Sequence, residues 1–128
     1  MLLAENALIL ARHHVVYCYH FSRPVSPFHT CQHYLGYADD LEARDAEHRA
    51  GTGARLTEVA VERGIELLLV WAIPGDRSLE RRLKRWHNTP QLCPGCAGRH
   101  HPIILAQRLP PDLPERPQDL EDLEDLPF

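Results

Sequence analysis

The chain of 128 residues is long enough for one small domain with a modest hydrophobic core and a tail. Its 44% hydrophobic and 25% charged residues are ordinary for a globular protein, and no apolar run approaches the roughly 20 residues that span a bilayer. The apolar opening segment is interrupted by Glu5 and follows no basic residues, which argues against a secretory signal and predicts a cytoplasmic protein without membrane contact.

The net charge of −4 hides a segregation of charge along the chain. Residues 1–108 contain 13 Lys and Arg against 11 Asp and Glu, a balance of +2. Residues 109–128 contain one Arg against seven acids, a balance of −6. A mildly basic folded part is compatible with nucleic acid, although phosphate binding depends on where the cationic side chains cluster.

The first half of the domain begins with two predicted strands. Residues 15–21 are β-branched or aromatic at most positions, which predicts a strand. Residues 22–31 contain two prolines and predict a loop, and residues 32–37 predict a second, antiparallel strand. Alternation places four side chains on one face of the first strand: Val15, Tyr17, Tyr19 and Phe21.

Two helices are predicted to follow. Asp39 or Asp40 is the expected N-cap of a helix that ends near Ala50, where Gly51 favours a stop. A second helix is predicted over residues 54–63.

The second half begins with residues 65–73, an almost wholly apolar run that predicts a buried strand ending at Pro74. Asp76 or Ser78 can then cap a third helix that continues through Trp86. The order strand, strand, helix, helix, strand, helix predicts an α+β fold. We therefore expect a small three-stranded antiparallel sheet flanked by helices.

Several polar side chains on these elements have the chemistry of phosphodiester hydrolysis. Arg44 and His48 lie four residues apart and share one face of their predicted helix. Glu80 borders the apolar stripe of the third helix, and Tyr17 and Tyr34 come from neighbouring strands. A carboxylate can hold a hard metal ion, a guanidinium can neutralise charge on phosphate, and a phenol or imidazole can carry the proton of an attacking water.

These residues resemble the motifs of the GIY-YIG nuclease family. Residues 15–17, Val-Val-Tyr, match the GIY half of the family signature, and residues 34–36, Tyr-Leu-Gly, match the YIG half. The spacing of Arg44 and His48 is similar to that of an arginine and a histidine on the family's first helix. Glu80 is similar in placement to the metal-binding glutamate. Valine and leucine replace the signature glycine and isoleucine, and both keep strand character.

The resemblance implies a metal-dependent DNA endonuclease that hydrolyses phosphodiester bonds with a single Mg²⁺ or Mn²⁺ ion. Glu80 would be the only protein ligand of that ion, Arg44 would bind the scissile phosphate, and Tyr17 would act as general base or help to activate water. Four further residues would orient the substrate or support the site: Tyr34, Gly36, His48 and Asn88.

The resemblance also divides the chain into four parts. Residues 1–14 would be an N-terminal extension and residues 15–92 the GIY-YIG-like nuclease domain. Residues 93–108 would form an extension that contains Cys and His. Residues 109–128 are a Pro-rich, acidic tail with too little apolar content to fold alone, so this tail is expected to be disordered.

Each of these residues also has a plain structural interpretation. The two tyrosines would then be half-buried strand residues, and Arg44 and His48 would lie on a solvated helix face. Glu80 would simply pair with Lys84 one helical turn later. The same residues therefore allow a second function, a non-catalytic DNA- or protein-binding module of the same fold.

Asp45 follows Leu41 by four residues, on the side of the helix that is expected to face the core. A buried carboxylate without a partner is costly. We therefore expect either that this helix is rotated or that Asp45 has a partner such as Arg49.

A second set of metal-binding residues follows the domain. Cys93 and Cys96 flank a Pro-Gly turn and are followed by His100 and His101, which are ligand types that zinc prefers. Two sulfurs and one or two imidazoles could complete a tetrahedral site. The short separation between the two pairs favours reduced thiols without metal instead.

Residues 119–128 form an acidic run that ends in Leu126, Pro127 and Phe128. This ending resembles the C-terminal tip of bacterial single-stranded-DNA-binding proteins, which implies docking onto replication or repair proteins. In the binding-module interpretation, recruitment would depend on this tip. The alternative is a solubilising tail that weakly shields the basic part of the chain.

Overall fold

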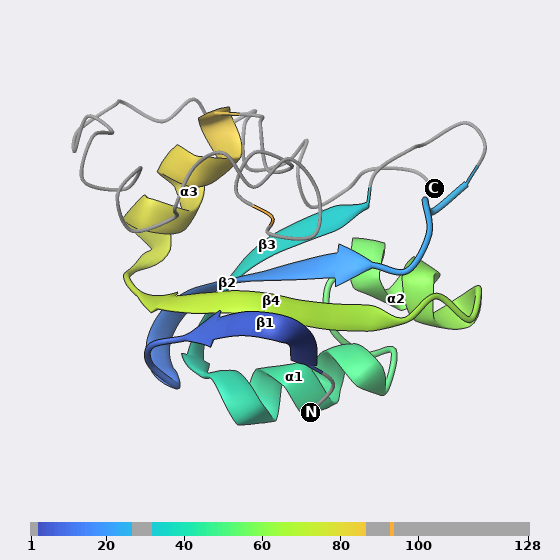
Figure 1. The fold of residues 1–128 in the computed structure, drawn as a ribbon, viewed down its shortest axis with the longest axis horizontal. Helices are drawn as coiled ribbons and strands as arrows, with labels where there is room; N and C mark the ends of the chain where they lie inside the picture. Colours follow the sequence, from blue (N-terminus) through green and yellow to red (C-terminus); the bar gives the residue numbers. More distant parts are fainter. Residues whose placement is uncertain (1–2, 27–31, 87–92, 94–128) are drawn as a thin grey trace.

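The computed structural model describes residues 3–26, 32–86 and 93, and these form a sheet with helices on both faces (Figure 1). The elements are β1 (Leu3–Ile9), β2 (His13–Phe21), β3 (His33–Asp40), α1 (Leu41–Arg49), α2 (Arg55–Glu62), β4 (Leu67–Pro74) and α3 (Arg77–Trp86). The α+β class and the predicted order of six elements are therefore confirmed over residues 13–86. The tail at 109–128 and its proposed docking tip lie outside the described residues.

Within the described ranges, the sheet has four strands in the order β1-β4-β2-β3. The central strand β2 pairs antiparallel with both β3 and β4, as expected, but β1 pairs parallel with β4. The prediction of a three-stranded, wholly antiparallel sheet is therefore wrong, because part of the expected N-terminal extension occupies the free edge of β4. The register of β1 shifts between Leu3 and Leu8, a stretch that includes Glu5, and this irregularity breaks the alternating pattern of a regular strand.

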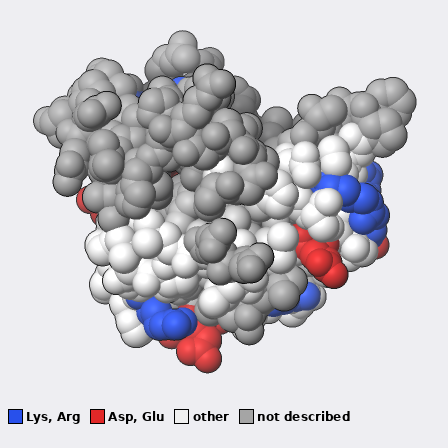
Figure 2. Space-filling model, in the orientation of Figure 1, with Lys and Arg blue, Asp and Glu red and all other residues white. Residues whose placement is uncertain are grey.

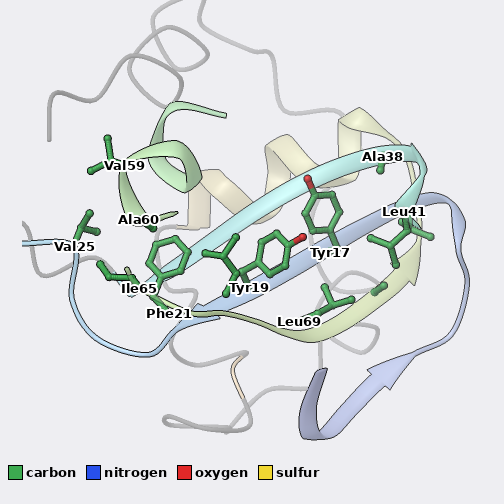
Figure 3. Close-up of a cluster of buried hydrophobic side chains, with 13 residues drawn as sticks. Tyr17, Tyr19, Phe21, Val25, Ala38, Leu41, Val59, Ala60, Ile65 and Leu69 are labelled. Atoms are coloured by element: carbon green, nitrogen blue, oxygen red, sulfur yellow. The ribbon is translucent and has the colours of Figure 1, made fainter. Parts of the chain in front are cut away.

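Side chains of β2 alternate between two hydrophobic clusters, one on each face of the sheet. The predicted four residues, Val15, Tyr17, Tyr19 and Phe21, all pack in one cluster with Leu41 of α1 and with Val59 and Ala60 of α2. Figure 3 shows Tyr17, Tyr19 and Phe21 in this cluster. The intervening Val16 and Cys18 face α3 and pack in the other cluster with Leu79 and Leu83. Because β2 is buried on both faces, it is the element on which both layers of helices are built.

Local capping explains where the helices begin and end. The Asp40 carboxylate accepts a hydrogen bond from the Ala43 amide at 3.3 Å, and the Asp76 carboxylate accepts one from the Leu79 amide at 2.9 Å. Gly51 follows α1 with a φ of 78°, a left-handed conformation that favours glycine. The starts of α1 and α3 and the end of α1 therefore follow from residues close to them in the sequence, whereas α2 begins without a side-chain cap.

Asp45 is buried, and it has the partner that the sequence required. Its carboxylate accepts a hydrogen bond from the Arg49 Nε at 2.9 Å and a very short one from the Tyr19 hydroxyl. Arg49 also donates to the Leu67 carbonyl at 3.0 Å. The hydrogen bonds of Asp45 and Arg49 therefore join α1 to β2 and to the start of β4.

Among the described strands, β3 lies at the edge of the sheet, and none of the others pairs with its outer side. Helix α1 lies on one face of the sheet and helix α3 lies on the other face. Both helices contact β3. Side chains from both layers can therefore meet around this edge. Within the part of the chain that is described, none of the helices has the length and apolar character needed to cross a membrane.

Replacing Asp45 with Ala should lower the free energy of unfolding by about 3 kcal/mol, because the buried Tyr19 hydroxyl and the Arg49 guanidinium lose their shared acceptor. Urea unfolding followed by circular dichroism measures this difference. The matched control is Glu62→Ala on exposed α2 surface, which should change stability by less than about 0.5 kcal/mol. Equal stability of the two variants would show that Asp45 is not a structural acceptor.

Candidate active site

A pocket of about 590 Å³ lies against β3 and is also lined by side chains of α1 and α3 and by residues at the start of α2. Three of the residues predicted for phosphodiester chemistry line it: Tyr34, Arg44 and Glu80. They come from β3, α1 and α3, elements that are far apart in the sequence. The folding of the sheet edge therefore brings a phenol, a guanidinium and a carboxylate to one cavity.

Glu80 lies in the wall of this pocket with only 8% of its surface exposed. Its Oε2 is 3.5 Å from the Lys84 Nζ, so the pairing that the sequence suggested is present. Lys84 also lies 5.8 Å from the centre of the Tyr34 ring. The Glu80–Lys84 pair is therefore part of the pocket and not an arrangement on an open helix face.

Arg44 is one-third exposed and reaches the pocket from α1. Its Nη1 donates to the Glu47 Oε2 at 2.7 Å. A guanidinium has five N–H donors in a planar fork, so one ion pair does not use all of them. Arg44 is thus held in place by Glu47 and can still bind an anion in the pocket.

Tyr17 and His48 are fully buried behind the pocket wall and are hydrogen-bonded to each other, with 2.5 Å between the Tyr17 hydroxyl and the His48 Nε2. The Thr57 Oγ1 lies 2.8 Å from the His48 Nδ1, and it donates its own proton to the Ala54 carbonyl at 2.9 Å. Because Thr57 has only one hydroxyl proton, it must accept from His48 Nδ1. This assigns the neutral Nδ1–H tautomer to His48, so that Nε2 accepts the proton of Tyr17.

Burial controls the protonation of both groups. It raises the pKa of the Tyr17 phenol, with Tyr34 adding to the increase and the Arg44 charge opposing it. It also lowers the pKa of His48 to about 4, and the nearby Arg44 charge has the same effect. At neutral pH the phenol is therefore protonated and the imidazole is neutral, which agrees with the hydrogen-bonding pattern.

Gly36 has a geometric reason to be glycine. It lies opposite Tyr17 in the β2–β3 ladder. A Cβ added at Gly36 would lie 2.5 Å from the Tyr17 hydroxyl and 2.9 Å from the Tyr34 ring. The missing side chain therefore lets two phenols lie over the backbone of β3.

The structure also changes two of the plain interpretations. His48 is fully buried, so it does not belong to a solvated helix face, and Tyr17 is buried rather than half-buried. Two further residues contact His48 without any signal in the sequence: Thr57, and Gly53, where any Cβ would overlap the His48 imidazole. No local motif marks either residue, because both contact His48 only after α1 and α2 have packed together.

Some predicted residues cannot be located relative to this pocket. Asn88, the proposed supporting residue, lies outside the described residues, as do three of the four proposed zinc ligands, Cys96, His100 and His101. The fourth, Cys93, is buried in a different cluster with His20 and His33. Within the described ranges, this cluster of three residues could hold a metal ion.

Acidification from about pH 7.5 to about pH 5 should destabilise the protein, because unfolded His48 takes up a proton near its ordinary pKa of about 6.5 and folded His48 resists until about 4. The unfolded state binds more protons than the folded state in this range. The stabilisation that comes from neutral His48 is therefore fully present above pH 6.5 and is lost as the pH falls towards 4. The contribution of His48 to this loss should be about 2 kcal/mol.

Urea unfolding of the wild type and of His48→Gln at both pH values measures the effect. The variant should lose about 2 kcal/mol less than the wild type on acidification, whatever its absolute stability. Other groups with a lowered pKa, such as His33, contribute equally to both proteins and cancel. An identical loss in both proteins would mean that His48 is not a buried neutral imidazole.

Comparisons of the chain with protein-family models, with curated proteins and with solved structures found no match. The function proposed below therefore depends on the resemblance of its motifs to those of GIY-YIG nucleases and on the geometry of its own side chains.

Proposed function

We propose that the protein is a metal-dependent DNA endonuclease that hydrolyses phosphodiester bonds with one Mg²⁺ or Mn²⁺ ion bound by Glu80. The observation that carries this proposal is the meeting of Tyr34, Arg44 and Glu80 in one pocket. The hydrogen-bonded pair of Tyr17 and His48 directly behind the pocket wall adds a route for a proton. A binding module would not need a phenol, a guanidinium, a carboxylate and an imidazole around one cavity.

The residues of the pocket suit a hard divalent ion. Glu80 offers carboxylate oxygens, the ligand type that Mg²⁺ and Mn²⁺ prefer, and the pocket has room for water and for a phosphate. Lys84 lies 3.5 Å from one of these oxygens, a distance longer than that of a tight charge-assisted hydrogen bond. When bound, the ion would neutralise charge on the phosphate and lower the pKa of a coordinated water.

The charges of the pocket favour this dependence on a cation. Its lining contains four acids and four bases, so the side chains alone are close to neutral: Asp39, Asp40, Glu47, Glu80, Arg44, Arg55, Arg77 and Lys84. Figure 2 shows small mixed groups of basic and acidic residues on the visible described surface and no continuous basic patch there. Attraction of a phosphodiester to this pocket therefore needs positive charge beyond that of these lining side chains.

Arg44 is the residue that would contact the scissile phosphate. Its Nη1 is engaged with Glu47, which fixes the orientation of the guanidinium while other N–H groups remain to donate to phosphate oxygens. Arg77 and Arg55 line the same pocket and would contact neighbouring phosphates of the backbone. The Arg77 guanidinium lies 5.1 Å from the centre of the Tyr37 ring, which holds it beside β3.

Tyr17 and His48 would handle the proton of the attacking water. Since the pKa of Tyr17 is raised by burial and that of His48 is lowered to about 4, neither group is charged at rest. Tyr17 is fully buried and does not line the pocket, so this step requires that substrate binding opens the wall between them. Tyr17 would then pass its proton to His48 as it accepts the proton of the water, so that no isolated phenolate forms. Thr57 keeps the His48 Nε2 free of a proton and ready to accept.

Metal-dependent nicking of supercoiled plasmid DNA tests the proposal. Replacing Glu80 with Ala should lower the rate by at least about 100-fold, because the pocket loses its ligand for the ion. Arg44→Ala should cost about 100- to 1,000-fold through lost stabilisation of the phosphate, and Tyr17→Phe should cost a similar factor through lost proton transfer. Agarose gels of the nicked product over time give the rates.

The control is Glu62→Ala, which removes an exposed carboxylate of α2 that does not line the pocket and should nick like the wild type. Circular dichroism of each variant separates loss of activity from loss of the fold. Equal nicking by the wild type and Glu80→Ala would contradict the proposal and point to a contaminating nuclease. In that case DNA binding without cleavage would support the binding module.

A further inference from the structure

A second group of metal-ligating side chains lies at one end of the β2–β3 hairpin. His20 and His33 are paired opposite each other in the ladder, and the His20 Nδ1 lies 3.1 Å from the His33 Nε2. The Cys93 Sγ lies 3.6 Å from the same His20 nitrogen. None of the three residues lines the pocket of the proposed nuclease site, so this group is a separate feature.

Two distances within this group match the coordination shell of a tetrahedral zinc ion. With Zn–N bonds of about 2.0–2.1 Å and Zn–S bonds of about 2.3 Å, neighbouring ligands lie roughly 3.3 Å apart for two nitrogens and 3.6 Å for a nitrogen and a sulfur. The two distances of 3.1 and 3.6 Å agree with these values, and all three atoms lie within 4.8 Å of one another. The side chains therefore need little movement to bind an ion.

The surroundings of the cluster also suit zinc. Cys93 is fully buried, and both histidines are partly buried, which shields a bound ion from competing water. Two imidazole nitrogens 3.1 Å apart cannot both carry a proton, so at least one lone pair points into the space between them. Imidazole and thiolate ligands favour zinc over the hard ions Mg²⁺ and Ca²⁺.

We propose that His20, His33 and Cys93 bind a zinc ion at a site that is distinct from the divalent-ion site at Glu80. Zinc binding would convert the Cys93 thiol to a thiolate and release its proton to solvent, and the fourth coordination position would be open to water or to another ligand. The ion would fix Cys93, which follows α3 in the sequence, to the end of the hairpin formed by β2 and β3.

This site differs from the one that the sequence suggested around Cys93, Cys96, His100 and His101. Only Cys93 is common to both sets. The two histidines of the proposed zinc site come from β2 and β3. Variants of the two pairs of histidines therefore distinguish the two sites. The Glu80→Ala variant should keep the zinc, because Glu80 is not among the three ligands.

Zinc and cobalt binding by the full-length protein tests the proposal. After removal of metals with a chelator, the wild type should bind one Zn²⁺ per chain, as measured by native mass spectrometry. Co²⁺ in its place should give a thiolate-to-cobalt charge-transfer band in the near ultraviolet. Cys93→Ser should abolish this band, and His33→Gln should weaken zinc binding by at least about 100-fold, since even residues that only orient ligands cost about 10- to 100-fold.

Two variants serve as controls. His13→Gln replaces an exposed histidine of the same strand and should bind zinc like the wild type, as should the double variant His100→Gln, His101→Gln. His20→Gln provides a second ligand variant if His33→Gln does not fold. Wild-type zinc affinity in folded His20→Gln or His33→Gln would overturn the proposal, as would a zinc content of the wild type well below one ion per chain.

Discussion

The arrangement of the candidate active site depends on one buried hydrogen-bonded chain, from Tyr17 through His48 to Thr57. An imidazole without partners in this position would cost several kcal/mol, because burial removes its hydrogen bonds to water. Both ring nitrogens are satisfied only when α1, α2 and β2 are in register with one another. The same register turns Arg44, one helical turn before His48, towards the pocket. Packing and the geometry of the site are therefore consequences of the same contacts.

Much of the fold is predictable from the sequence because its signals are local. Alternation along β2 places four residues on one face, as the structure confirms: Val15, Tyr17, Tyr19 and Phe21. Helix ends follow from Asp40 and Gly51 in the same way. The burial of Asp45 demanded a partner, and Arg49 is one helical turn away. In the site, the resemblance to GIY-YIG motifs points to Tyr34, Arg44 and Glu80, and these three residues line one pocket.

The features that the sequence did not predict all depend on contacts between distant segments. Strand β1 was missed because the stretch around Glu5 breaks its pattern, and only the free edge of β4 makes it a strand. Thr57 became a partner of His48 through the packing of α2 on α1. His20 and Cys93 are 73 positions apart in the sequence, and the spacing of the three residues of this cluster along the chain matches no metal-binding motif. Pairing of β2 with β3 alone brings its two histidines together.

The central claim is that Glu80 holds a divalent ion in the pocket that it shares with Arg44 and Tyr34. Titration of the ¹⁵N-labelled protein with Mn²⁺ tests it directly, because the paramagnetic ion broadens the amide signals of residues close to it. Selective broadening around Glu80, Arg44 and Tyr34 that is absent in Glu80→Ala is the predicted result. Broadening that is unchanged in Glu80→Ala, or that is absent from these residues in the wild type, would contradict the claim.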